Sequence, residues 1–284
     1  MDDVHPKQVL QAMIDAGAAK AGLGGGQMLV RGALGGAILA CATTLAFAAT
    51  AQTNVPVVGA VLFPAGFVLI LLLGLELVTG SFALWPLALL KKRITARRMF
   101  IACAWAIAGH LIGCAAYAAL YVLAITKMGA DAGGPLAQAL IQASEAKTIV
   151  YRAMGLDGML LVVVKAMLCN WMVTLGAAVS FKSTSTFGKI AAMWLPVLLF
   201  YGQGFEHAVV NMFVIPAGML LGADVGLGDW WLWNQLPVLL GNAFGGAVFT
   251  GLLFYWSQKE TGIAPARAIS GVQEDTGGKI NRWG

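Results

Sequence analysis

The amino-acid sequence predicts an all-α polytopic membrane protein with six transmembrane helices, of which the second and fifth are broken. Two observations predict this fold class. First, 59% of the 284 residues are hydrophobic and only 11% are charged, whereas soluble domains carry about 25% charged residues. Second, six apolar segments each exceed the ~20 residues that a spanning helix needs; they cover residues 30–52, 57–90, 99–126, 155–181, 188–222 and 230–256.

The composition also argues against several classes of site. The four cysteines lie inside apolar runs without metal-ligand or CxxC spacing, so we expect neither disulfides nor a zinc site; they are Cys41, Cys103, Cys114 and Cys169. No glycine-rich loop is followed by Lys-Ser or Lys-Thr, which leaves nucleotide binding without support. The net charge is +5, but the basic residues are spread among loops, so nucleic acid is not an expected partner. We expect no cofactor.

The chain begins with a polar arm, residues 1–28. Pro6 can occupy a first helical turn, and apolar residues then recur at helical spacing, at Val9, Leu10, Met13 and Ile14. The glycines at 22 and 24–26 end this helix before the first span. No apolar core follows a basic start, so we do not expect a cleaved signal peptide. The sequence predicts an amphipathic helix on the membrane surface, in contact with lipid headgroups or a neighbouring subunit.

The distribution of basic residues predicts the orientation. We divide the chain into the arm, a transmembrane channel domain at 29–257 and a C-terminal tail at 258–284. Fourteen of the 18 lysines and arginines lie in the arm, the second-to-third and fourth-to-fifth connections and the tail, or at the ends of the adjoining spans (Arg31 and Lys189). The opposite face has only Lys127, Lys147 and Arg152, and Lys165 lies inside the fourth span. The positive-inside rule therefore predicts that both termini are cytoplasmic, in a cell inner (plasma) membrane.

The second and fifth apolar segments carry carboxylates at their middles, Glu76 and Glu206. In the fifth, Gly202 and Gly204 come just before Glu206 and His207. An ionisable residue inside a span costs several kcal/mol and is usually kept for a substrate or ion pathway. Glycines beside it indicate a helix that breaks and restarts, which is how membrane transport sites are commonly built. The alternative is a structural histidine bonded to a neighbouring helix.

An internal repeat supports the same division. Gly74-Leu75-Glu76 in the second span matches Gly204-Phe205-Glu206 in the fifth, and residues 109–113 (GHLIG) in the third match residues 241–245 (GNAFG) in the sixth. Counted from the glutamate to the first glycine of the second motif, the separation is 33 residues in one copy and 35 in the other. Copies three spans apart run in opposite directions through the bilayer. The pattern predicts a three-plus-three inverted repeat with a transport site at the midplane.

Taken together, these motifs resemble the formate/nitrite transporter family, and the resemblance covers nearly the whole chain. It rests on Glu76 to Gly80 (ELVTG), Lys165 to Trp171 (KAMLCNW, with Asn170), Gly204 to His207 (GFEH) followed by Asn211-Met212, and Gly241-Asn242 with Gly245-Gly246. The ELVTG sequence followed by Leu-Trp-Pro-Leu at 84–87 is most similar to the branch of formate channels associated with formate dehydrogenases.

The resemblance implies an aquaporin-like fold, a homopentamer with one pore in each protomer, and conduction of formate, nitrite or hydrosulfide. It implies that His207 is the central pore histidine and that Thr79 is its opposing hydroxyl. It places Phe63 and Phe67 at the outer constriction, and the cytoplasmic constriction at Leu77, Val78 and Phe200. The family often has Phe where Val78 stands and Asn where Ser81 stands, so we expect a differently shaped inner gate.

The chemistry of a small carboxylate agrees with this role. An ionised carboxylate that enters an apolar constriction loses its hydration, so either a cation must accompany it or a proton must join it. Lys165 and His207 are the available sources. Lys165 can raise the local anion concentration, and His207 can donate a hydrogen bond or a proton. The alternative for Lys165 is a structural cation paired with Glu206 or a carbonyl.

Two further classes of function remain open from the residues alone. An aquaporin-type channel for neutral solutes would share the fold, but its Asn-Pro-Ala pair is absent. A membrane haem or quinone oxidoreductase could use His110 and His207 as ligands. We expect a channel and not an enzyme.

Overall fold

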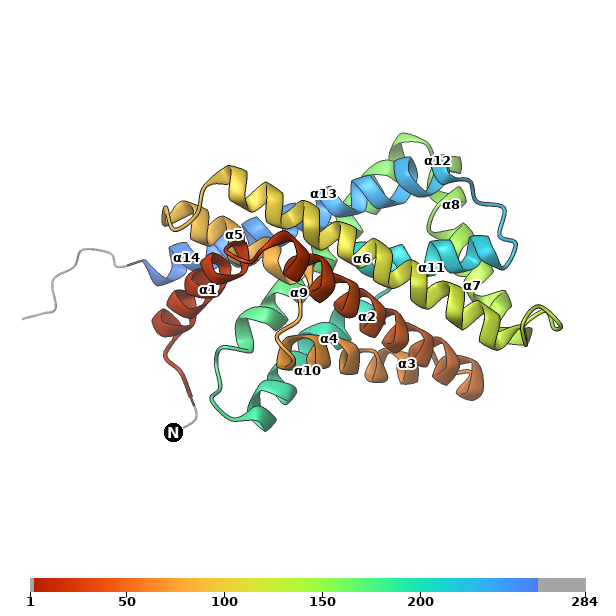
Figure 1. Ribbon diagram of the computed structural model, residues 1–284, viewed down its shortest axis with the longest axis horizontal. Coiled ribbons are helices and arrows are strands. Elements are labelled where there is room, and N and C mark those ends of the chain that lie inside the picture. Colours follow the sequence, from red (N-terminus) through yellow and green to blue (C-terminus); the bar gives the residue numbers. More distant parts are fainter. Residues whose placement is uncertain (1–2, 260–284) are drawn as a thin grey trace, which may run out of the picture.

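The computed structural model describes residues 3–259, which form helices and no β-strand (Figure 1). Of the predicted tail, residues 260–284 lie outside the described residues. Four helices in the described part are long and apolar enough to cross a membrane; they are α2 (Gly25–Thr53), α6 (Ala96–Ile125), α9 (Leu156–Val179) and a composite helix, Leu227–Gln258. They correspond to the first, third, fourth and sixth predicted spans.

The second and fifth apolar segments are each interrupted, as predicted. The second consists of α3 (Pro56–Leu62), α4 (Pro64–Leu72) and α5 (Val78–Leu90), and the fifth consists of α10 (Thr186–Gly202) and α11 (Ala208–Leu220). We call residues 73–77 the first break and residues 203–207 the second break. Each break lies between two apolar helices that are too short to span a bilayer alone.

The two breaks follow the same backbone course. Gly74 and Gly204 have φ of 65° and 66°, a left-handed conformation that glycine adopts without a steric cost. The next residue then bonds back to the preceding helix, because the Leu75 N–H donates to Ile70 O at 2.9 Å and the Phe205 N–H donates to Phe200 O at 3.2 Å. These contacts end α4 and α10 in the same way. The matched sequences at the two breaks therefore fold alike.

The composite sixth helix contains two π-helical stretches that the sequence did not predict. It runs through α12 (Leu227–Trp230), η1 (Trp231–Gln235), α13 (Leu236–Phe244), η2 (Gly245–Leu252) and α14 (Leu253–Gln258). Wider π-helical turns often occur at functional positions of membrane and soluble proteins. Here η1 places Asn234 and Gln235 in the interior, where neither side chain is exposed.

Three shorter helices lie across the ends of the long ones. The predicted arm forms α1 (Pro6–Ala21), whose apolar stripe packs against α5 and the ends of α9 and α14. The connection before the fourth span forms α7 (Gly134–Ala146) and α8 (Ile149–Ala153), which were not predicted. Figure 1 shows α1 and α14 at one end of the molecule and α7, α8 and α12 at the other. Both ends of the described chain therefore lie at the same end of the bundle.

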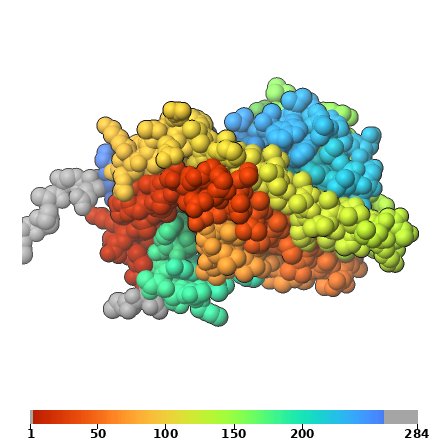
Figure 2. All heavy atoms as spheres, in the orientation of Figure 1, coloured from red at the N-terminus to blue at the C-terminus, as the bar shows by residue number. Residues whose placement is uncertain are grey.

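The outer surface of the long helices is apolar. Large side chains on them are exposed, including Phe100, Leu120, Leu156 and Leu240. In Figure 2, α1 lies flat against the neighbouring helices at its end of the molecule and does not project from it. An exterior of this kind suits a lipid or subunit environment and not water. The chain is a membrane protein.

Candidate functional site

The two breaks meet inside the bundle through His207 and Thr79. Nε2 of His207 lies 2.9 Å from the hydroxyl oxygen of Thr79, and both side chains are buried. Thr79 is the second residue of α5, and His207 is the residue that caps the N-terminus of α11. The N-terminal ends of two 13-residue helices therefore face each other. Because helix N-termini carry partial positive charge, this arrangement favours an anion between them.

The hydrogen bonds of His207 indicate which ring nitrogen carries the proton. The backbone N–H of Val210 donates to Nδ1 at 3.2 Å, so Nδ1 must offer a lone pair. A neutral ring then holds its proton on Nε2, which donates to the hydroxyl oxygen of Thr79. The Thr79 hydroxyl keeps its own proton for another acceptor. The Thr79 hydroxyl can thus donate a hydrogen bond to an anion while its oxygen accepts one from Nε2–H of His207.

Aromatic rings stack beside this pair. The ring of Phe200 lies 5.6 Å from the imidazole of His207 at 17°, and Phe63 meets Phe200 edge to face at 5.8 Å. Phe63 also stacks on Tyr201 at 3.9 Å. Phe200 therefore contacts both the imidazole of His207 and the ring of Phe63.

The remaining predicted constriction residues are buried at other positions. Phe67 packs on Gly176 of α9, where an added Cβ would come within 3.3 Å of its ring. Leu77 is the residue that caps α5 and Val78 is the first residue of that helix, and both are buried. No ring contact joins Phe63 to Phe67 among the described residues. All five predicted constriction residues nevertheless belong to one buried apolar cluster.

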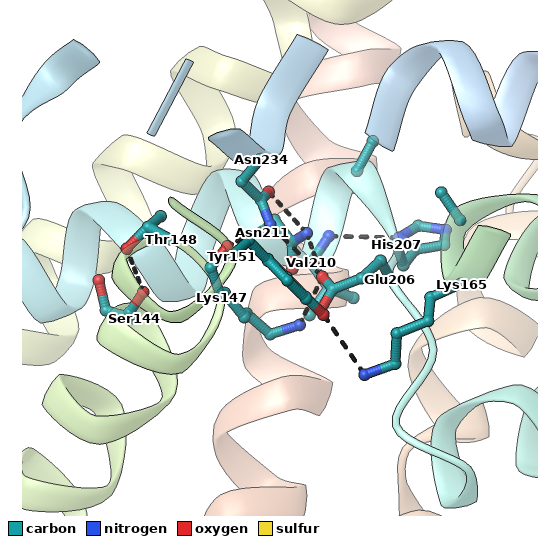
Figure 3. A network of polar contacts seen from close by, with 12 residues as sticks. Ser144, Lys147, Thr148, Tyr151, Lys165, Glu206, His207, Val210, Asn211 and Asn234 are labelled. Carbon is teal, nitrogen blue, oxygen red and sulfur yellow. Dashed lines mark hydrogen bonds and ion pairs between the residues drawn. The ribbon is translucent and has the colours of Figure 1, made fainter. Parts of the chain in front are cut away.

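Glu206 is the centre of a buried polar network (Figure 3). Its carboxylate accepts from Lys147 Nζ at 2.8 Å, from the Tyr151 hydroxyl at 2.9 Å and from Asn211 Nδ2 at 2.8 Å. Asn234, from η1, donates to the Lys147 carbonyl at 2.9 Å and accepts from Asn211 at 2.8 Å. A carboxylate with a cationic partner and several donors is stable in its ionised form even when buried. The network fixes α7, α8 and η1 around the second break.

Lys165 does not pair with Glu206 directly. Its ammonium nitrogen donates to the Tyr151 hydroxyl at 3.3 Å, and that hydroxyl in turn donates to Glu206. Burial, and next the charge of Glu206, raises the pKa of Tyr151 well above its usual range, so the hydroxyl stays protonated. Two lysines thus surround one carboxylate. The side of the second break that faces α8 keeps a net positive charge.

Glu76 has a matching partner at the first break. Lys20, near the end of α1, lies 3.0 Å from its carboxylate, and the Ser81 hydroxyl donates to the same carboxylate. Lys147 occupies the corresponding position, as the residue that caps the end of α7. Each break glutamate is therefore neutralised by a lysine from a short lateral helix. Both glutamates could be singled out in the sequence, whereas their lysine partners were not predicted, and Lys147 was counted as a loop charge.

Two asparagines connect the breaks to the rest of the bundle. Asn242 accepts from the Ala208 N–H at 2.9 Å and donates to the carbonyls of Ala166 and Glu206 at 2.8 and 3.0 Å. Asn170 of α9 donates to the carbonyls of Thr79 and Asn242 at 3.0 and 2.6 Å. Asn170 therefore joins the first turn of α5 to α13. Asn170 was predicted as a site residue, whereas Asn242 was named only as part of the repeat and of the family motifs.

A cavity of ≈ 300 Å³ lies on the α1 side of the first break. We call it the α1-side cavity. Its lining includes Lys20 from α1, Gly74 and Leu75 from the break, Gly80 from α5 and Met193 from α10. Gly80 directly follows Thr79. The cavity therefore reaches the immediate neighbour of the His207–Thr79 pair.

The comparison with known proteins decides the family. A family model described as formate/nitrite transporter matches residues 7–256. The chain belongs to the formate/nitrite transporter family. The members with which it is compared below are channels and transporters, not enzymes.

Relatives cover most of this formate/nitrite transporter. The chain is 32% identical to the uncharacterized transporter YrhG of Bacillus subtilis over 88% of its own length and 92% of that protein. It is 31% identical to a probable formate transporter of Methanothermobacter thermautotrophicus, with coverage of 82% and 89%. It is 28% identical to the formate channel BtFdhC of Bacillus thuringiensis, with coverage of 88% and 94%.

Two solved structures share the fold of this transporter. One, described as an FNT family ion channel, has a TM-score of 0.77 at 24% identity and covers 89% of this chain and 100% of its own. Another, described as a pentameric formate channel with formate bound, has a TM-score of 0.67 at 22% identity and covers 82% and 97%.

Family membership and geometry together argue against the alternative of a haem or quinone oxidoreductase. Both ring nitrogens of His110 are used by the backbone, because the Val78 N–H donates to Nε2 at 3.0 Å and Nδ1 lies 2.8 Å from Gly32 O. Such a ring has no free lone pair with which to bind a haem iron. The two histidines therefore do not act as an axial ligand pair.

Proposed function

We propose that this transporter conducts small monovalent anions, with formate as its first substrate, through a pore that passes the His207–Thr79 pair. The names of two relatives and of a structural neighbour, which mention formate, support the choice of substrate. The observation that carries the proposal is the meeting of two half-helix N-termini at His207 and Thr79. Nitrite and hydrosulfide are the alternative substrates.

The charges along the route favour an anion at both ends. Lys20 lines the α1-side cavity, and Lys165 lies on the α8 side of the second break. Glu76 offsets the charge of Lys20, but Lys189 also lines that cavity. Lys147 and Lys165 share Glu206, so each end keeps a positive charge for an anion. Between these ends the anion passes the aromatic rings of Phe63 and Phe200, which set the width of the path.

The central step replaces the hydration of the anion by fixed donors. The Thr79 hydroxyl and the N-terminal dipoles of α5 and α11 supply donors without net charge. If formate takes a proton there, the ring must first gain one from water at Nδ1, in place of the Val210 contact; Nε2 then gives its proton to the Thr79 hydroxyl, whose own proton joins formate, and the ring is neutral again. A neutral acid crosses the apolar constriction at far lower cost than an ion. His207 is therefore the proton or hydrogen-bond donor.

The arrangement in the membrane is an aquaporin-like inverted repeat of three plus three spans. The equal backbone conformation at Gly74 and Gly204 and the matching glutamate–lysine pairs support it. The end of the molecule that holds α1 and α14 faces the cytoplasm, in an inner (plasma) membrane. The basic connection between α5 and α6 is then cytoplasmic, as the positive-inside rule requires. Domain limits of 1–28, 29–257 and 258–284 follow from the same arrangement.

The functional unit is a homopentamer with a pore in each protomer and lipid around it. The pentameric neighbour and the apolar exterior support this assembly. Native mass measurement in mild detergent should return five copies. Monomers alone would contradict it.

Flux into proteoliposomes tests the substrate. Formate, nitrite, hydrosulfide and lactate are compared side by side in vesicles that contain the purified protein and in empty vesicles. We expect formate to enter fastest and lactate slowest. Swelling in glycerol or water without any anion flux would instead favour an aquaporin-type neutral solute channel.

A further inference from the structure

His110 is a buried histidine that the proposed path does not use. It lies in α6 and is not exposed. The first N–H of α5, from Val78, donates to its Nε2 at 3.0 Å, and its Nδ1 lies 2.8 Å from the carbonyl of Gly32 in α2. A backbone N–H can only donate and a carbonyl can only accept. The ring must therefore be neutral with its proton on Nδ1.

Asn242 makes the same contacts at the other break. Its Oδ1 accepts from Ala208, the first N–H of α11, and its Nδ2 donates to the carbonyl of Ala166 in α9. A glycine precedes each of these two capping residues and packs closely on the helix that provides the carbonyl acceptor. Gly109, before His110, packs on α2, and Gly241, before Asn242, packs on α9. Each caps a half-helix and ties it to a long helix. One half of the molecule uses an imidazole for this purpose and the other uses an amide.

The first N–H groups of a helix have no partner within it, so a buried N-terminus needs an acceptor from elsewhere. Leu77, which precedes α5, provides no side-chain cap. His110 supplies the missing acceptor, one residue before Thr79. Losing it would leave the Val78 N–H buried and unpaired, and the first turn of α5 would move to find a partner.

We propose that His110 is a positioning residue for transport: as a neutral imidazole with its proton on Nδ1, it anchors α5 to α2 and so holds the Thr79 hydroxyl opposite His207. It does not give a proton to the permeating anion. The charged groups that act on it are Glu76 of the first break and Lys20 of α1, which pair with each other. The role in transport rests on the proposed function, whereas the protonation state does not.

The two buried histidines should therefore be opposite neutral tautomers. The chain has three histidines, so solid-state NMR of protein labelled with nitrogen isotope in histidine alone can resolve them, and His110→Gln identifies the His110 signals. We expect His110 to carry its proton on Nδ1 and His207 on Nε2. The His110 signal should stay unchanged between pH ~5 and ~8, where an ordinary histidine titrates. A charged His110, or one protonated on Nε2, would overturn the proposal.

Formate flux then tests the positioning role. His110→Leu removes both contacts, and we expect flux to fall about tenfold or more, because small displacements of a working group are costly. His110→Gln keeps an acceptor and a donor and should retain most of the flux. Tyr117→Phe, two turns further along α6, removes a hydroxyl contact with Thr44 of α2 but no contact with the first turn of α5; it is the matched control and should leave flux unchanged.

A double-mutant cycle shows whether His110 acts through Thr79. In a Thr79→Val background, His110→Leu should cause no further loss, since the hydroxyl that it positions is already gone. An equal loss in both backgrounds would overturn the proposal. If His110→Leu does not assemble, the cycle is run with His110→Ala, which also removes both contacts, and if that variant fails too the tautomer measurement on the parent protein decides. If the parent protein carries no formate at all, the proposed function fails, while the tautomer result still decides the protonation state.

Discussion

Nε2 of His207 and the hydroxyl of Thr79, which are 128 residues apart in the sequence, lie 2.9 Å from each other and join the first turns of two half-helices. Neither residue has a polar counterpart at the repeat-related position, which is Leu77 for His207 and Val209 for Thr79. The frame around the breaks is therefore repeated, whereas the polar pair at its centre occurs once.

Removing the Thr79 hydroxyl should reduce transport. In Thr79→Val the shape is kept, but the anion loses its donor and His207 Nε2 loses its acceptor, so we expect formate flux to fall at least about tenfold. Thr79→Ser keeps the hydroxyl and should retain most of the rate. Stopped-flow uptake into proteoliposomes measures both variants. Equal rates for the valine and serine variants would show that the hydroxyl is not used.

Size selection should depend on the aromatic cluster. Phe63→Ala removes the ring that meets both Phe200 and Tyr201, which widens the path beside His207. We expect lactate uptake to rise relative to formate uptake, and more so in the double variant with Phe67→Ala. Leu69→Ala, on the exposed side of α4, is the control. An unchanged lactate-to-formate ratio in the double variant would place the size filter elsewhere.

The buried pair at the second break should matter for stability. Lys147 and Glu206 lie 2.8 Å apart with side-chain exposures of 20% and 3%, whereas Arg93 and Asp15 pair with about half of each side chain exposed. Lys147→Met leaves a buried carboxylate without its cation, and we expect a loss of about 3 kcal/mol. Arg93→Met should leave the unfolding midpoint unchanged, because exposed pairs contribute little. Unfolding midpoints in detergent test this contrast, and similar midpoints for the two variants would refute it.

Lys165 should act on anion capture more than on the central step. Its charge is not matched by a carboxylate of its own, so Lys165→Met lowers the local anion concentration on the α8 side. We expect the formate concentration for half-maximal flux to rise several-fold at low salt, with a smaller change in maximal rate. Lys127→Met removes an exposed lysine paired with Asp131 and should change neither. A purely lower maximal rate would indicate a structural role.

Much of this architecture could be predicted because the membrane limits the choices. Apolar length revealed the long helices, and glycine followed by a glutamate revealed the breaks, since only glycine takes the left-handed turn at Gly74 and Gly204 without a steric cost. The pairing of the GHLIG and GNAFG segments was also informative, because His110 and Asn242 cap the half-helices in the same way.

Other features had weaker signals. The lateral helix α7 is only 13 residues long, too short for a span. The partners of the glutamates could have been found, because Ala16 to Lys20 and Ala143 to Lys147 share the pattern Ala-x-x-Ala-Lys. The π-helical turn that brings in Asn234 has no compositional signature. Which rings lie against Phe200 depends on packing between helices distant in sequence.

Replacement of His207 tests the central claim most directly. Formate flux into proteoliposomes is measured as external pH falls toward ~6, for the parent and for His207→Phe, after both are shown to assemble alike. A permeating anion that takes a proton carries it across, so flux in the parent should increase as external pH falls. The phenylalanine ring keeps the volume but has no nitrogen, so flux should fall strongly and its pH dependence should be lost. If His207→Phe carries formate with the rate and pH profile of the parent, His207 is a structural residue and the proposed mechanism is wrong.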